Sequence, residues 1–108
     1  MKQMETLNRI GLAPRLKRRI ASRIDRLMQR YRGLKGVHLN CRREAPRGKG
    51  TRYAVSARLE LRGYDQIVKK RSGNLLKAIV DVLDVGERQL RRRNRLIKTR
   101  RRSLAATF

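Results

Sequence analysis

The sequence predicts an α+β fold, a two-layer sandwich in which both helices cover one face of a four-stranded, mostly antiparallel sheet. Two stretches place apolar residues at steps of three and four, which is the period of a helix. Between them, three stretches alternate apolar and polar residues, which is the period of a half-buried strand. With one more strand expected at the start, the order is β-α-β-β-β-α. The 108 residues suffice for one domain, over 1–102, followed by a flexible tail at 103–108.

The first two elements precede the glycines at positions 33 and 36. We expect an edge strand over Met4–Ile10, where no apolar run long enough for a signal peptide is visible. Pro14 suits the first position of a helix, because the N–H that proline lacks is not needed there. The helix is expected to run to Arg32, before the glycines end it. Its apolar stripe consists of Leu16, Ile20, Ile24, Leu27, Met28 and Tyr31.

The three strands that follow are expected to share one apolar face. Residues 37–42 alternate apolar and polar side chains, and the Gly- and Pro-containing segment 44–50 is a loop by composition. Residues 52–62 show the clearest alternation in the chain. A hairpin connection at 63–65 then leads into a return strand over 66–71. The alternation of apolar and polar residues therefore predicts a meander of antiparallel strands with one apolar face available for packing.

The last helix, expected over Asn74–Arg102, has two halves of different composition. Asn74 is a good N-cap, because its side-chain oxygen can accept a hydrogen bond from an N–H of the first turn. The first half carries the apolar seam Leu76, Ile79, Leu83 and Leu90, and the second half, from Arg88 on, is mostly arginine. One helix is thus expected to pack on the sheet and also to present charge.

The net charge of +23, from 31 Lys+Arg against 8 Asp+Glu, points to a polyanionic partner, and nucleic acid is the obvious one. Arginine predominates over lysine, which favours bidentate contacts with phosphate. An anionic membrane is disfavoured, because no helix pairs a basic face with exposed Trp, Phe and Leu. A charge run that is merely solvated is also disfavoured, since so few acids balance the bases.

Two arginine clusters are the candidate RNA-binding surface, one on the first helix and one on the last. If the helices lie side by side, these clusters can form one strip that follows the phosphates of folded RNA. The candidate residues are Arg15, Arg18, Arg19, Arg26, Arg30, Arg88, Arg91, Arg92, Arg95 and Lys98. On the last helix, Asp84 with Arg88 and Glu87 with Arg91 are expected to form i,i+4 ion pairs.

The aromatic content of 4% argues against a sheet that stacks bases, so RNA recognition is expected to depend on backbone and shape. Tyr31 and Tyr53 fall on predicted core faces, whereas Tyr64 falls at a turn and is the candidate exposed ring. His38 is expected on a strand surface, and Cys41 as a small core residue.

No catalytic constellation and no metal-ligand spacing is visible, so we expect neither an enzyme nor a cofactor or metal. A single cysteine fits a reducing cytoplasm.

Three pieces of the sequence resemble the ribosome hibernation promoting factor family, also called the ribosome-associated inhibitor or sigma-54 modulation family. In the last helix the matches are Ala78-Ile79, Asp84 and Glu87–Arg91, the last resembling the family's E-R-Q-L-R register. Arg52–Val55 resembles the family's Y-x-V strand, and Val37-His38 its V-H strand. The resemblance covers nearly the whole chain and implies a short, divergent member.

The departures lie in the last helix. Asn74 stands where the family usually has Asp, and Leu76 replaces a Tyr. Val80 and Val85 replace an Asp and a Lys, and Gly86 replaces a core Leu. A glycine inside a helix costs about 1 kcal/mol relative to alanine, so the substitution at Gly86 requires a structural reason.

The resemblance implies a fold similar to a double-stranded-RNA-binding domain and a ribosome-binding function. Such a protein binds rRNA of the small ribosomal subunit in the channel for mRNA and tRNA, and it silences idle ribosomes under stress or in stationary phase. Short members act with a ribosome-dimerising partner protein. From the residues alone, two alternatives stay open: a general double-stranded RNA- or DNA-binding module, and a structural ribosomal or assembly protein.

Overall fold

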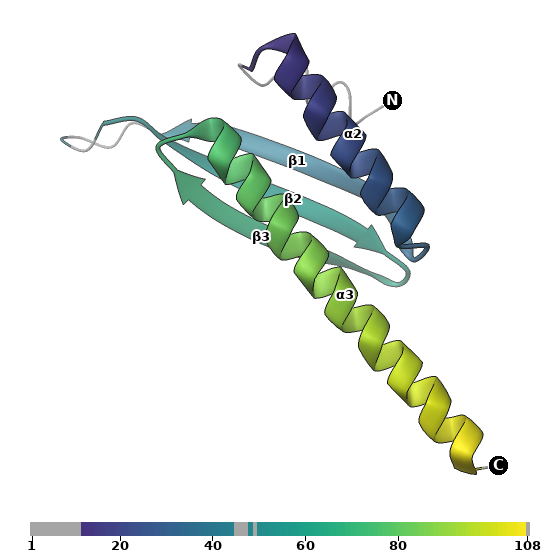
Figure 1. Cartoon of the computed structure of the whole chain (residues 1–108). Coiled ribbons are helices and arrows are strands. Elements are labelled where there is room, and N and C mark those ends of the chain that lie inside the picture. The colour runs from purple at the N-terminus through teal and green to yellow at the C-terminus, as the bar shows by residue number, and fades with distance from the viewer. Residues whose placement is uncertain (1–11, 45–47, 49, 108) are drawn as a thin grey trace.

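The computed structural model describes residues 12–44, 48 and 50–107, of which 99–107 are described by their backbone. Two helices enclose three consecutive strands in the sequence. The elements are α2 (Pro14–Arg30), β1 (Leu34–Glu44), β2 (Arg52–Leu61), β3 (Tyr64–Ser72) and α3 (Leu75–Thr107). The strands form an antiparallel sheet in the order β1-β2-β3, and both helices lie on the same face of it, α2 along β1 and α3 across β2 and β3 (Figure 1).

The class is α+β, but the prediction of a four-stranded sheet was wrong, because the described sheet has three strands, all between the helices. The strand expected over Met4–Ile10 lies outside the described residues. The three observed strands are joined by hairpins, so each pairs with its neighbour in the sequence. The expected fourth strand rested on a short alternating pattern, and such a pattern does not determine pairing.

Helix α2 begins where the proline signal predicts. Pro14 is at its first turn, and the carbonyl of Ala13 accepts the N–H of Leu16 at 3.0 Å. At the other end the N–H of Tyr31 donates to the carbonyl of Leu27 at 2.9 Å. The predicted apolar stripe faces the sheet, and its buried members are Ile20, Ile24, Leu27 and Tyr31.

The sheet register sets which side chains share a face. Leu39, Ala57 and Val68 are opposite one another across the three strands, and all three are buried beneath the helices. The β2–β3 hairpin pairs Leu61 with Tyr64, and Gly63 occupies φ +83° in its turn, a conformation that favours glycine.

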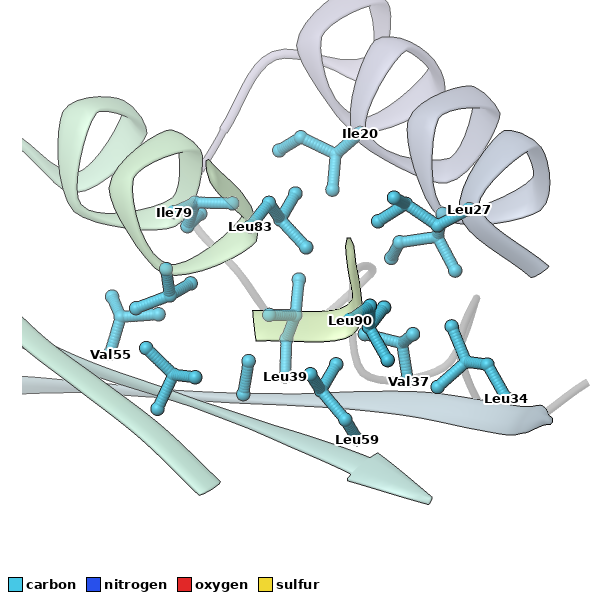
Figure 2. Packing of buried hydrophobic residues seen from close by; sticks show 14 of the residues in the cluster. Ile20, Leu27, Leu34, Val37, Leu39, Val55, Leu59, Ile79, Leu83 and Leu90 are labelled. Carbon is cyan, nitrogen blue, oxygen red and sulfur yellow. The ribbon is translucent and has the colours of Figure 1, made fainter. Parts of the chain in front are cut away.

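One hydrophobic core lies between the helices and the sheet, and Figure 2 shows side chains from α2, β1, β2 and α3 pointing into it. Gly86 lies where α3 crosses β2: a Cβ at this position would be 3.2 Å from Leu59 Cδ1. The glycine therefore allows close approach of the helix to the sheet, which offsets its low helix propensity.

Helix α3 is much longer than its packing surface. It begins at the predicted cap, where Asn74 Oδ1 accepts the N–H of Lys77 at 3.1 Å. Its 33 residues extend about 50 Å at the usual helical rise. Leu90 is its last buried side chain among those described, and beyond it the helix projects past the sheet (Figure 1). The helix continues to Thr107, through most of the segment for which the sequence predicts a flexible tail.

Candidate nucleic-acid interface

All ten cations that the sequence analysis assigns to RNA binding are exposed. They are Arg15, Arg18, Arg19, Arg26 and Arg30 on α2, and Arg88, Arg91, Arg92, Arg95 and Lys98 on α3. Of these, Arg30 contacts Glu87 at 3.5 Å. Because all ten side chains are exposed, an external anion can reach them.

The two helices are connected by ion pairs on their facing flanks. Arg23 of α2 contacts Asp84 at 2.5 Å and Glu87 at 3.6 Å, and its side chain is only 24% exposed. The Tyr31 hydroxyl also donates a hydrogen bond to the Glu87 carboxylate, at 3.4 Å. These contacts hold α2 next to the middle of α3 and use the two acids of α3 that lie nearest to its arginines.

The predicted pairs within α3 are not the ones that the structure shows. Asp84 and Glu87 contact arginines of α2 instead of Arg88 and Arg91. The reason is that both acids lie on the flank of α3 that faces α2, within reach of Arg23. Consequently Arg88 and Arg91 keep their charges uncompensated among the described side chains.

A groove of about 340 Å³ lies between the helices. Its floor is apolar, with Leu76, Val80 and Leu83 from α3, while Arg19 and Arg26 of α2 line the other side. Those two arginines belong to one flank of α2 that faces α3. Their guanidinium groups are thus placed where α2 meets α3.

The exposed cations of α3 form a separate row. Arg88, Arg91, Arg95 and Lys98 follow one another at steps of three and four, so they share one side of the helix. The row begins directly after Glu87, which contacts Arg30 at the end of α2. The two predicted clusters therefore adjoin at this point and do not run alongside each other. Arg92 lies apart from the row and lines a different groove, with Tyr64.

The sheet face away from the helices carries basic residues that the sequence analysis missed. Asn40, Ser56 and Lys69 lie in one cross-strand row, and Arg42, Ala54 and Arg71 in the next. These residues line a shallow groove of about 600 Å³. The signal was present in the polar positions of the alternating strands, which were used only to identify the apolar face.

Acids partly neutralise this open face. Glu44 contacts Arg42 at 3.1 Å and Arg71 at 3.7 Å. Toward the other end of the strands, Arg58 contacts Asp65 at 3.0 Å, and His38 is 3.2 Å from Glu60. The strongest uncompensated positive charge is thus on the helices.

The three tyrosines have different environments. Tyr31 is buried, with 4% of its surface exposed, which confirms its predicted place in the core. Tyr53 is partly buried, and Tyr64 is 49% exposed at the start of β3. The Arg93 guanidinium lies over the Tyr64 ring, 5.8 Å from its centroid. Only Tyr64 is therefore placed to contact a ligand through its ring.

Cys41 is partly buried and packs against the core, as predicted. Burial raises the pKa of its thiol from 9.0 to about 11, so the thiol stays protonated at neutral pH.

The described residues contain no group of three or more His, Cys, Asp or Glu side chains that could hold a metal ion. None of the helices in this part of the chain combines the length and apolar character that crossing a membrane requires.

Comparison with protein-family models finds no match for this chain, and a search of the curated proteins also finds none. The resemblance to hibernation factors therefore stays a prediction.

Proposed function

We propose that this protein binds structured RNA through the arginine-bearing sides of α2 and α3, in the cytoplasm. The observation that carries the proposal is the row of exposed cations that begins at Arg88 and continues on the part of α3 that extends beyond the sheet. The arginines of α2 adjoin this row where Arg30 contacts Glu87. A projecting helix with cations on successive turns can follow a phosphate backbone in a groove or channel that the wider sheet cannot enter.

The composition of the exposed surface favours backbone contacts over base reading. The residues of the open sheet face that lie across from one another include no aromatic ring among those described, so this sheet is not a platform for stacked bases. Long arginine side chains provide charge and bidentate hydrogen bonds without requiring a sequence.

The target that we propose is rRNA of the small ribosomal subunit, in the channel for mRNA and tRNA. The support is the family resemblance of the last helix together with the position of its cations. Occupying this channel would exclude mRNA and tRNA and silence idle ribosomes. No catalysis is proposed.

The test is sedimentation of the purified protein with 30S and 70S particles through sucrose gradients. We expect co-sedimentation at physiological salt, release by added tRNA, and inhibition of translation in a reconstituted system. Equal affinity for ribosomes and for arbitrary RNA or DNA duplexes would favour a general duplex-binding module. One copy per particle in growing cells would favour a structural ribosomal or assembly protein. Absence of binding to any RNA would refute the proposal.

A further inference from the structure

A groove of about 640 Å³ lies beside the start of β3, under the part of α3 that leaves the sheet. It is lined by Tyr64, Gln66, Gln89, Arg92, Arg93, Leu96 and Ile97. This volume is within the range of pockets that hold small ligands. The groove lies on the opposite flank of α3 from α2, so the proposed backbone contacts leave most of it unused.

The aromatic ring of the groove is held in place by residues that are distant in the sequence. Arg93 lies over the Tyr64 ring, and its Nη1 is 3.0 Å from the position that a Cβ on Gly33 would occupy. The absence of a side chain at Gly33 thus leaves room for the guanidinium. With one face of the ring against Arg93, the exposed side of Tyr64 is available for stacking.

The polar groups of the groove match the edge of a nucleobase. Gln66 Nε2 donates a hydrogen bond to Gln89 Oε1, and this contact orients both amides. A glutamine amide has both a donor and an acceptor, so the pair still presents the Gln66 carbonyl oxygen and the Gln89 amino group. The edge of a nucleobase also carries hydrogen-bond donors and acceptors side by side, which can pair with these two groups.

The rest of the groove supplies an apolar wall and a positive charge. Leu96 is 59% exposed and provides an apolar surface at the groove. Arg92 is exposed at the same groove and is placed to contact the phosphate attached to a base in the groove. None of the lining residues is acidic, which disfavours a basic peptide as the occupant.

We infer that this groove binds a single unpaired nucleobase of the RNA, which stacks on Tyr64 while its edge contacts Gln66 and Gln89. The inference depends on the proposed RNA binding and adds one point of base contact to a surface that otherwise recognises the backbone. Bulged nucleotides and loop ends, which splay a base out of the helix, are the RNA features that it selects.

The test compares two RNA hairpins that differ by one bulged uridine in the stem, with the full-length protein at fixed salt. Stacking on an aromatic side chain corresponds to about 5- to 150-fold in affinity per base. We therefore expect the protein to prefer the bulged hairpin by a factor in this range. Tyr64→Phe should keep the preference, because phenylalanine retains the ring face, whereas Tyr64→Ala should abolish it and leave affinity for the plain stem within about twofold.

Ile67→Ala is the matched control, because Ile67 is an exposed apolar residue of the same strand, 57% exposed, and does not line the groove. This variant should prefer the bulged hairpin by the same factor as the unmodified protein does. In addition, 4-thiouridine at the bulge should crosslink to the peptide that contains Tyr64.

An unchanged preference in Tyr64→Ala would overturn the inference, as would equal binding of both hairpins by the unmodified protein. An acidic peptide that binds in a Tyr64-dependent way, without any effect of the bulge, would also overturn it. Failure to bind either hairpin, together with failure to sediment with ribosomal particles, would instead refute the proposed RNA binding. If the protein binds ribosomal particles but neither hairpin, only the inference about the groove is overturned, so the two failures are distinguishable.

Discussion

Removal of three cations from the projecting row of α3 should change the salt dependence of RNA binding by a calculable amount. Arg88→Gln, Arg91→Gln and Lys98→Gln together lower the net charge from +23 to +20 (23 − 3), and all three side chains are exposed. Each phosphate neutralised contributes about 0.7 to 0.9 to the slope of log K against log salt. If each cation contacts one phosphate, the slope should fall by roughly 2 to 3.

The same reasoning gives an affinity change that can be measured directly. Between 50 and 200 mM salt, the loss of affinity should be about 20- to 40-fold smaller in the triple variant than in the unmodified protein. The assay is a binding titration with purified small subunits at four or five salt concentrations in this range. The slope is the critical measurement, because it reports the number of phosphates contacted and not simply the overall charge.

The control removes the same charge from the open face of the sheet. Arg42→Gln, Arg52→Gln and Lys69→Gln also give +20, and these side chains are exposed as well. We expect this variant to keep the slope of the unmodified protein. Equal slopes for all three proteins would refute the assignment of the interface to α3, and a lower slope for the sheet variant alone would place the interface on the sheet.

Three further predictions concern stability and reactivity. Gly86→Leu should lower the free energy of unfolding by roughly 1 to 3 kcal/mol in urea titrations, because the added side chain meets Leu59. Gly86→Ala should change it by less than about 1 kcal/mol, and equal stability of both variants would contradict the close approach of α3 to the sheet. A double-mutant cycle of Arg23→Gln and Asp84→Asn should give a coupling of about 0.5 to 1 kcal/mol, and additive effects would show that this ion pair does not stabilise the helix contact. Burial raises the pKa of the Cys41 thiol to about 11, so alkylation by iodoacetamide at pH 8 should be roughly 100-fold slower in the folded protein than in urea, and equal rates would refute this burial. Because folding favours the neutral thiol, the free energy of unfolding should decrease as the pH rises from 9 toward 11.

The sequence was most informative where the spacing of apolar residues alone distinguishes a helix from a strand and identifies its buried side. The stripe that contains Ile20 and Ile24 predicted α2, and the proline and asparagine signals predicted where both helices begin, as Pro14 and the Asn74 hydrogen bond show. The alternation in β2 placed Val55 toward the helices, where it is buried. These features depend on local backbone chemistry and on burial of one side of each element.

Contacts between distant residues could not be read in this way. The i,i+4 rule offered Arg88 as the partner of Asp84, but the tertiary fold brings Arg23 closer. Likewise, no pattern in the sequence connects Gly33, Tyr64 and Arg93, which meet only because α3 passes over the hairpin end of the sheet. The sequence therefore identified which residues carry charge but not which charges are already paired.

The extension of α3 beyond the core has a thermodynamic consequence. Arg88 with Arg92, and Arg91 with Arg95, are like-charged neighbours four residues apart, and each such pair opposes helix formation by a few tenths of a kcal/mol. Among the described side chains, none after Leu90 is fully buried, so packing in the core does not stabilise this segment. A polyanion removes the repulsion, so helix formation in this segment and RNA binding are linked equilibria, and RNA should raise the helix content and the thermal midpoint together.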